Sequence, residues 1–295
     1  MAEQYELSSE DFELFGRTFL AMTGMRIDGT RRPVLARVLS SRLKLTDTES
    51  VAEYCQFVTE DQPESRAEIE ALVKSLAIKE TCFFRNEPQW EALREHILPE
   101  LIAESAARQQ PLRVWSAGCS TGEEPYTLAL LLKEHFSSPW VQIHATDIDP
   151  SALEKAAQGE YSARSVRRMD RRYLDAYFHA EGERYVLDKA VRKMVRFSCL
   201  NLADAAALSS VPDMGELDLV LCRNVIMYFP RDLASQLLAR IAESLREGGC
   251  LVLGHAEMMY HRPGLQIEQY GDAFFYRKTG QQSGPSGLAT GRPEG

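Results

Sequence analysis

The sequence predicts an α/β protein in which a helical N-terminal domain precedes a Rossmann-like domain with a small antiparallel β-insertion. Residues 1–90 place apolar side chains at helical spacing, without an alternating strand pattern. From residue 111 onward, short apolar runs alternate with helical segments, which is typical of a parallel, doubly wound sheet. We therefore expect a helical domain over 1–90, a linker helix over 91–110, the α/β domain over 111–280 and a disordered tail over 281–295.

Helices account for the first part of the chain. They are expected over residues 11–24, 31–45, 50–60 and 66–78. Gly24 is a suitable stop for the first helix, and Pro33 lies near the start of the second. A further helix over 87–105 is expected to connect the two domains and to pack on the second.

Strands of the α/β domain are expected within the apolar runs at 112–118, 141–150, 217–229 and 250–257. Right-handed crossovers bring the C-terminal ends of parallel strands to one edge of the sheet, where ligands bind. Two shorter strand-like pieces, 183–188 and 193–200, predict an antiparallel β-insertion over about 178–197. The pattern over 266–278 predicts a closing hairpin.

Composition limits the classes of function. A net charge of −9 argues against broad nucleic-acid binding, which needs a basic surface. No apolar run is long enough to span a bilayer, and the acidic N-terminus lacks the features of a signal peptide. The six cysteines are scattered without a C-x-x-C pair, so buried thiols are expected rather than a zinc site or disulfides. We expect a cytoplasmic monomer that does not insert into a membrane.

A glycine loop follows the first strand. Gly118 and Gly122 precede a helix that opens with Glu123 and Glu124, and their spacing is not the G-x-G-x-x-G of dinucleotide binders. Two carboxylates at a helix N-terminus suit the helix dipole, but they would repel a pyrophosphate. A cationic, hydroxyl-rich ligand such as S-adenosylmethionine (SAM) fits better. The alternative is a plain strand-to-helix turn with capping acids.

Two acids follow the second strand. Asp147 ends that strand, where an acid typically accepts hydrogen bonds from ribose hydroxyls. Asp149 precedes Pro150 and suits the N-cap of the next helix. We therefore assign Asp147 to the ligand and Asp149 to the cap. His144 lies within the strand and is expected to be a strand residue rather than a catalytic one.

Five segments in order resemble the chemotaxis receptor glutamate methyltransferases, the CheR family. They are ETCFFRN, AGCSTGEEPYTLA, ATDIDPSALEKA, FSCLNL and LVLCRNVIMYF. The resemblance covers roughly residues 8–278 and implies SAM-dependent methyl esterification of glutamate side chains on the cytoplasmic helices of chemoreceptors. It also implies the helical domain, the SAM-binding α/β domain and the small β-subdomain.

The resemblance carries ligand contacts to this chain position by position. It assigns to the cofactor Thr81, Arg85, Glu124, Asp147, Asn201, Leu202, Arg223 and Asn224, and the glycine loop itself adds Gly118. Lys79 stands where the family often has Asn, so its contact with a cationic ligand is in doubt. The β-insertion is shorter than in members that dock on a receptor's C-terminal pentapeptide, and we therefore expect no use of that tether.

The implied reaction is an in-line displacement at the SAM methyl carbon by a carboxylate oxygen. Glutamate is already ionised at neutral pH, so neither a general base nor a metal is needed. We expect Arg85 to fix a carboxylate through its forked donors, and Tyr228 to orient the attacking oxygen through its hydroxyl. The alternatives are that Arg85 only pairs with an acid, that Tyr228 is a core aromatic, and that Arg223 and Asn224 only shape a loop.

A basic stripe on the second helix is the candidate receptor surface. Arg37 and Lys44 are seven residues apart, opposite an apolar face that includes Leu35 and Leu39. An acidic methylation helix could lie against them; the alternative is an ordinary solvated face.

Two other classes of function stay open. A non-catalytic nucleotide-binding adaptor is opposed by the full set of site residues. A dinucleotide-dependent oxidoreductase is opposed by the missing glycine pattern and by the acid pair.

Overall fold

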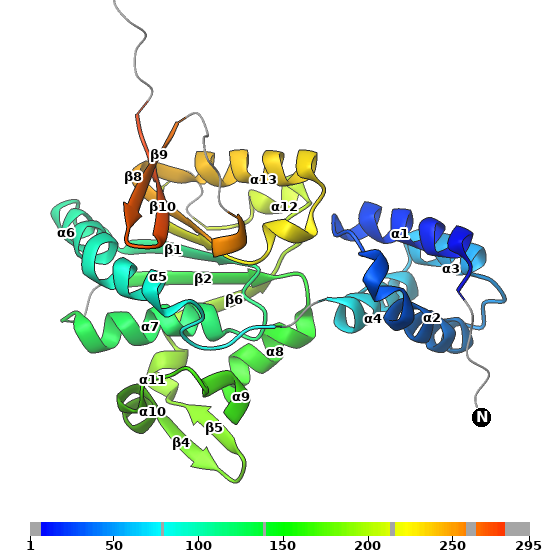
Figure 1. The fold of residues 1–295 in the computed structure, drawn as a ribbon, viewed down its shortest axis with the longest axis horizontal. Helices are drawn as coiled ribbons and strands as arrows, with labels where there is room; N and C mark the ends of the chain where they lie inside the picture. Colours follow the sequence, from blue (N-terminus) through cyan, green and yellow to red (C-terminus); the bar gives the residue numbers. More distant parts are fainter. Residues whose placement is uncertain (1–6, 78–79, 138–139, 213–215, 258–263, 281–295) are drawn as a thin grey trace, which may run out of the picture.

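The computed structural model describes residues 7–77, 80–137, 140–212, 216–257 and 264–280. Lys79 and the tail over 281–295 lie outside these residues. The helical domain contains α1 (Ser9–Thr23), α2 (Arg32–Thr46), α3 (Val51–Thr59) and α4 (Pro63–Leu76), with a 3₁₀ turn at Gly29–Arg31. This domain lies to one side of the α/β domain (Figure 1).

Local sequence signals set the ends of the first helix. The Ser8 side chain accepts a hydrogen bond from Asp11 N–H at the N-terminus, and Gly24 ends the helix with φ of +74°. The buried faces of the helices form one apolar core that includes Phe15, Leu35 and Leu72. The predicted stop at Gly24 is therefore confirmed.

The main sheet has the strand order β6-β2-β1-β7-β8-β10-β9. Its strands are β1 (Leu112–Ala117), β2 (Val141–Asp147), β6 (Val195–Cys199), β7 (Leu217–Cys222), β8 (Leu245–Leu253), β9 (Leu265–Tyr270) and β10 (Ala273–Lys278). The first five strands in that order pair in parallel, and β10 and β9 add an antiparallel hairpin. This order confirms the predicted α/β class and the closing hairpin.

Helices cover both faces of the sheet (Figure 1). The remaining helices are α5 (Glu87–Ala92), α6 (Leu98–Ala107), α7 (Glu123–His135), α8 (Pro150–Gln158), α9 (Ala163–Val166), α10 (Arg171–Tyr177), α11 (Lys189–Arg192), α12 (Ala205–Leu208) and α13 (Arg231–Ser244). Val114 joins the apolar core under α5 to α7, and its neighbour Trp115 joins the core under α13, because successive strand residues point to opposite faces. The segment expected as a linker helix is thus a layer on the sheet, with π-helical turns at Leu93–Ile97.

The small sheet differs from the expectation in one strand. It consists of β3 (Glu160–Ser162), β5 (Arg184–Leu187) and β4 (Phe178–Glu181), all antiparallel. The piece over 193–200, expected in this insertion, instead forms β6 and pairs in parallel with β2. The expectation was wrong because a short alternating run does not show which strand it will pair with.

Two further findings concern the surface. Within the described ranges, no helix is long and apolar enough to cross a membrane. Five of the six cysteines are buried, whereas Cys199 is exposed, so the expectation of buried thiols is wrong for that residue.

Candidate active site

The loop after β1 has an unusual backbone conformation. Gly118, Ser120 and Gly122 have φ of +76°, +50° and +90°, in the left-handed region that favours glycine. The backbone nitrogens of Gly118 and Cys119 donate to the Thr146 carbonyl at 2.8 and 2.9 Å, which ties the loop to the end of β2. Gly122 is then the N-cap residue of α7, so the chain turns directly from strand to helix.

Glycine at position 118 is required by space as well as by φ. A Cβ there would lie 2.5 Å from a methyl carbon of Val225. We expect Gly118→Ala to lower the free energy of unfolding by about 2–4 kcal/mol, from left-handed strain and overpacking, as measured by urea unfolding.

Gly16→Ala is the control for that measurement. A Cβ at Gly16, inside α1, meets nothing within 4 Å. Alanine at position 16 is expected to raise the free energy of unfolding, by at most about 1 kcal/mol, because its helix propensity is better than that of glycine. A loss below about 0.5 kcal/mol for Gly118→Ala, the usual range of a surface change, would contradict the close packing of this loop.

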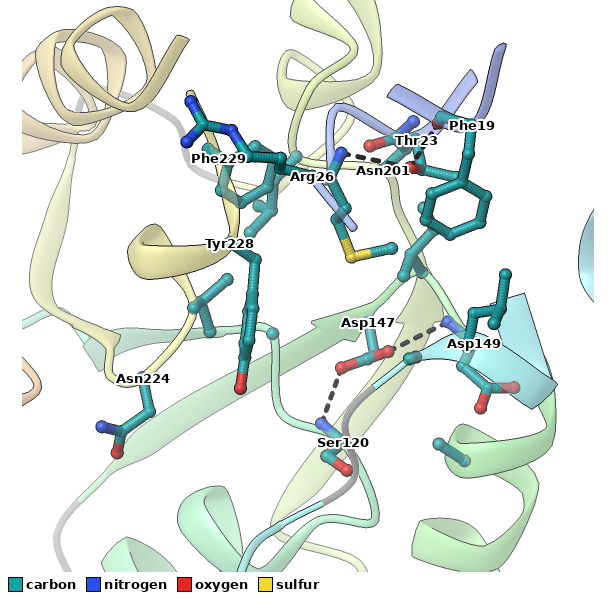
Figure 2. A pocket seen from close by; sticks show the side chains of 18 of the residues that line it. Phe19, Thr23, Arg26, Ser120, Asp147, Asp149, Asn201, Asn224, Tyr228 and Phe229 are labelled. Carbon is teal, nitrogen blue, oxygen red and sulfur yellow. Dashed lines mark hydrogen bonds between the residues drawn. The ribbon is translucent and has the colours of Figure 1, made fainter. Parts of the chain in front are cut away.

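Asp147 organises the loop from the end of β2. Its Oδ2 accepts from Ser120 N–H at 2.7 Å and its Oδ1 from Asp149 N–H at 2.9 Å (Figure 2). Asp149 caps α8, because its Oδ1 accepts from the backbone N–H and hydroxyl of Ser151 at 2.9 and 2.7 Å. The expected cap is therefore confirmed, and the assignment of Asp147 to the ligand stays a prediction.

Glu124 and Arg223 form a buried ion pair between α7 and the end of β7. The Arg223 Nη1 lies 3.4 Å from Glu124 Oε2, and Ser116 Oγ donates to Glu124 Oε1 at 2.8 Å. Only 4% of the Arg223 side chain and 12% of the Glu124 side chain are exposed. The charge at position 223 is thus paired.

Arg223 also holds the segment that carries Arg85. It donates to Gln89 Oε1 at 2.8 Å and to the Arg85 carbonyl, and its guanidinium lies 4.9 Å from the centre of the Trp90 ring. Trp90 Nε1 donates to the same Arg85 carbonyl at 3.0 Å. The Arg85 side chain itself donates to the Glu80 carbonyl at 2.6 Å. The predicted cofactor contact Arg223 therefore has four partners among the described residues: Glu124, Gln89, the Arg85 carbonyl and the Trp90 ring.

Burial dominates the electrostatics of the site. It raises the pKa of Glu124, against the opposing charge of Arg223, and it lowers the pKa of Arg223, against Glu124. Burial also raises the pKa of Tyr228, against the opposing charge of Arg85. The Tyr228 hydroxyl therefore keeps its proton at neutral pH and can donate a hydrogen bond.

A cavity with about 850 Å³ of empty space, part of it open to solvent, lies between the two domains. The α/β domain contributes Asp147, Asn201 and Tyr228 to its lining, and the helical domain contributes Phe19 and Arg26 (Figure 2). The backbone N–H of Arg26 donates to the Tyr228 carbonyl at 2.8 Å, so the two domains are joined at the cavity wall.

A second cavity of about 490 Å³ adjoins the first. Thr81, Arg85, Glu124 and Arg223 line it, so its wall is more polar and more charged. The residues shared by both cavities are Gly118, Ser120, Asn224 and Tyr228. The structure thus brings together sequence-predicted residues from segments that are more than a hundred residues apart.

Other predicted residues have different surroundings. Asn201 and Leu202 line the larger cavity, but the Asn201 amide is engaged with backbone: it donates to the Met22 carbonyl at 3.0 Å and accepts from Ala203 N–H at 2.9 Å. Arg37 and Lys44 are exposed on α2 and are not among the residues that line these two cavities.

Glu257 is a site residue that the sequence analysis missed. Its buried carboxylate accepts from the backbone N–H groups of Asn224 at 2.6 Å, Gly254 at 3.0 Å and Met227 at 3.1 Å. It therefore fixes the turn that carries Tyr228. An acid at or shortly after the end of a buried strand was the available signal, and Asp147 gives the same signal at the end of β2.

Comparison with known proteins follows the two domains. Residues 10–77 match the family model "CheR methyltransferase, all-alpha domain", and residues 79–271 match "CheR methyltransferase, SAM binding domain". The chain is 35% identical to "Chemotaxis protein methyltransferase 1" of Pseudomonas aeruginosa, over 92% of this chain and 98% of that protein. It is 34% identical to "Chemotaxis protein methyltransferase 2" of Vibrio cholerae, over 86% of this chain and 87% of that protein.

The two family models together cover the helical domain and the α/β domain, and the match to each relative extends over both domains. The matched ranges contain the glycine loop, Asp147, the Glu124–Arg223 pair and Tyr228. The chain therefore belongs to the CheR family of SAM-binding chemotaxis methyltransferases.

Proposed function

We propose that this protein transfers the methyl group of SAM to glutamate side chains on the cytoplasmic helices of chemoreceptors. The products are glutamyl methyl esters and S-adenosylhomocysteine. The observation that carries the proposal is the pair of adjoining cavities, one largely apolar beside Asp147 and one polar beside Arg85, which meet at Tyr228. We place this reaction in the cytoplasm, on a protein partner rather than on nucleic acid.

The larger cavity suits the adenosine half of SAM. Ile148, Leu200 and Leu202 offer apolar surface for the adenine ring, and Asp147 lies where ribose hydroxyls are bound in folds of this type. Ser120 Oγ is buried with no hydrogen-bond partner among the described residues, at a position that lines both cavities. A buried hydroxyl without a partner favours a polar ligand group at this point.

The smaller cavity suits the methionine half. Glu124 offers a carboxylate for the ammonium group, and Thr81 and Arg85 offer donors for a carboxylate. Arg223 supports this set through its contacts with Glu124 and with the Arg85 carbonyl. We therefore assign Arg223 a positioning role.

SAM supplies a methyl group on a positively charged sulfur. In the displacement a bond forms between the glutamate oxygen and the methyl carbon while the bond from that carbon to sulfur breaks, so a neutral thioether leaves. No proton moves, because the glutamate is already ionised. This chain aligns the two reactants and excludes water. Arg85 holds the carboxylate of the methionine half, and the protonated Tyr228 hydroxyl donates a hydrogen bond to the attacking oxygen.

Two measurements on the full chain test the proposal. Calorimetry with SAM and with S-adenosylhomocysteine tests the site, and NAD serves as the control ligand. Transfer of a tritiated methyl group to chemoreceptor membranes, followed by release of methanol in base, tests the ester product. Binding of SAM without base-labile label on receptors would favour the non-catalytic adaptor and overturn the proposal.

We propose further that no receptor pentapeptide tether is used. In the small sheet Glu181 pairs with Arg184, so β4 and β5 are joined by a tight turn at Gly182 and Glu183, with Gly182 at φ of +60°. With this tight turn, the hairpin lacks the longer, glycine-bearing loop of family members that dock on the pentapeptide. Calorimetric titration of the pentapeptide is expected to give no measurable heat; tight binding would refute this part of the proposal.

The α2 stripe is the proposed receptor surface of the helical domain. Arg37 and Lys44 are both exposed, which such a contact needs. The double reversal Arg37→Glu/Lys44→Glu is expected to raise KM for receptor by about tenfold, because like charges across an interface repel. Affinity for SAM, measured by calorimetry, should stay unchanged, and a fall in that affinity would contradict the assignment.

A further inference from the structure

A third, open groove of about 1100 Å³ adjoins the polar cavity. The two share four lining residues, Glu80, Thr81, Cys82 and Arg85. Beyond Arg85 the groove runs over α9 and the residues after it. An acceptor that reaches Arg85 through this groove enters the polar cavity from the side of the small subdomain.

Arginines dominate the charge of this groove. Arg164, Arg167 and Arg168 line it together with Arg85, and all three are exposed. Two glutamates oppose them: Glu80 at the surface, and Glu123, whose pKa is raised by burial. On a chain with a net charge of −9, an excess of positive charge beside the reaction centre is a local feature that favours an anionic partner.

The groove arginines are held at a fixed place relative to Arg85. Phe83, in the same segment as Arg85, donates its N–H to the Ser165 carbonyl of α9 at 3.0 Å. Its ring lies 4.8 Å from Tyr161 and 5.4 Å from Phe178, two residues of the small sheet. The Tyr161 hydroxyl in turn donates to the Thr121 carbonyl of the glycine loop at 2.9 Å. The small subdomain thus forms one wall of the site, held in place by these contacts.

The existing pairing in the groove is weak enough to be exchanged. Arg164 lies 3.2 Å from Glu80, and both side chains are more than 70% exposed. An exposed pair of this kind contributes little, so a carboxylate of a partner can replace Glu80 at small cost. Arg167 donates to the Arg164 carbonyl at 3.0 Å, and it has no ion-pair partner among the described residues.

We propose that Arg164, Arg167 and Arg168 bind carboxylates that flank the acceptor glutamate on an acidic receptor helix. The inference rests on the proposed function, since it names how that substrate is recognised. It assigns to the small subdomain a direct contact with the methylated region, separate from any receptor tail. Such a contact raises the local concentration of acidic segments and rejects neutral or basic ones.

The test is Arg167→Ala/Arg168→Ala in the full-length protein, with a purified receptor cytoplasmic fragment as substrate. We expect KM for the fragment to rise about threefold to tenfold, with kcat and the Kd for SAM unchanged. The increase of KM with salt should be smaller for the variant than for the wild type. Arg171→Ala is the matched control, because Arg171 is 89% exposed on α10 of the same subdomain and does not line the groove.

A second arm changes the partner. Replacing acidic residues beside the methylation site of the fragment with glutamine should raise KM for the wild type, and should add little for the double variant. Wild-type activity with an unchanged KM for the variant would overturn this inference and leave the proposed function intact. Failure of the wild type to methylate the fragment would instead overturn the proposed function. Inhibition by RNA without sensitivity to the receptor carboxylates would show that the groove serves a nucleic acid, and would also overturn the inference.

Discussion

Replacing Asp147 with asparagine is expected to weaken SAM binding by about a hundredfold, which corresponds to about 2.7 kcal/mol. Both carboxylate oxygens accept backbone N–H groups, from Ser120 and from Asp149. Whichever way an asparagine amide is turned, its NH₂ group faces one of these donors. The substitution therefore loses the charge offered to the ribose hydroxyls and also disturbs the loop that lines both cavities. Calorimetry with S-adenosylhomocysteine measures the loss.

Asp149→Asn is the matched control for that experiment. Asp149 also lines the larger cavity, but its Oδ1 caps α8 through Ser151, and asparagine is as good an N-cap as aspartate. We expect its affinity for the ligand to change by less than about threefold, since the cap is retained. Equal losses for the two variants would show that the loop is sensitive to any neutralised acid, and that Asp147 has no special role toward the ribose.

Arg223→Met is expected to lower the free energy of unfolding by about 3–5 kcal/mol, because it leaves the buried Glu124 carboxylate without its cation. The same change removes the donors to Gln89 and to the Arg85 carbonyl. Urea unfolding at neutral pH measures the effect. The double variant Arg223→Met/Glu124→Gln is the control and should recover part of the loss, because it no longer buries an unpaired charge. A loss below about 1 kcal/mol for the single variant would contradict the buried pair.

The deficit of Arg223→Met should depend on pH. Burial already raises the pKa of Glu124, and Arg223 is the main group that lowers it. Without Arg223 the folded-state pKa rises further above the unfolded value. A group shifted in this direction contributes its full stability below the unfolded pKa, about 4.3 for glutamate, and loses it as pH rises through the folded pKa. The free energy of unfolding of the variant should therefore be closest to that of the wild type at acid pH, and the difference should grow as the pH rises toward neutral.

Local sequence was sufficient for much of the fold. Gly24 ends α1 and Asp149 caps α8, as expected, because capping depends on a few residues near the helix end. The alternation of apolar runs with helical segments was sufficient for the parallel sheet. The strand β6 was misplaced because strand pairing is a long-range property, and its partner β2 lies about fifty residues earlier in the chain.

The sequence by itself determined the elements around the glycine loop, the acid after β2 and the family to which the chain is similar. Only the tertiary structure decided which contacts those residues make. In the folded chain Arg223 is buried against Glu124, Glu257 accepts hydrogen bonds from the turn that carries Tyr228, and the helical domain lines the larger cavity. Asn201 bonds to the carbonyl of Met22, a residue 179 positions away. Contacts of that separation arise from packing between domains, which no local pattern of side chains records.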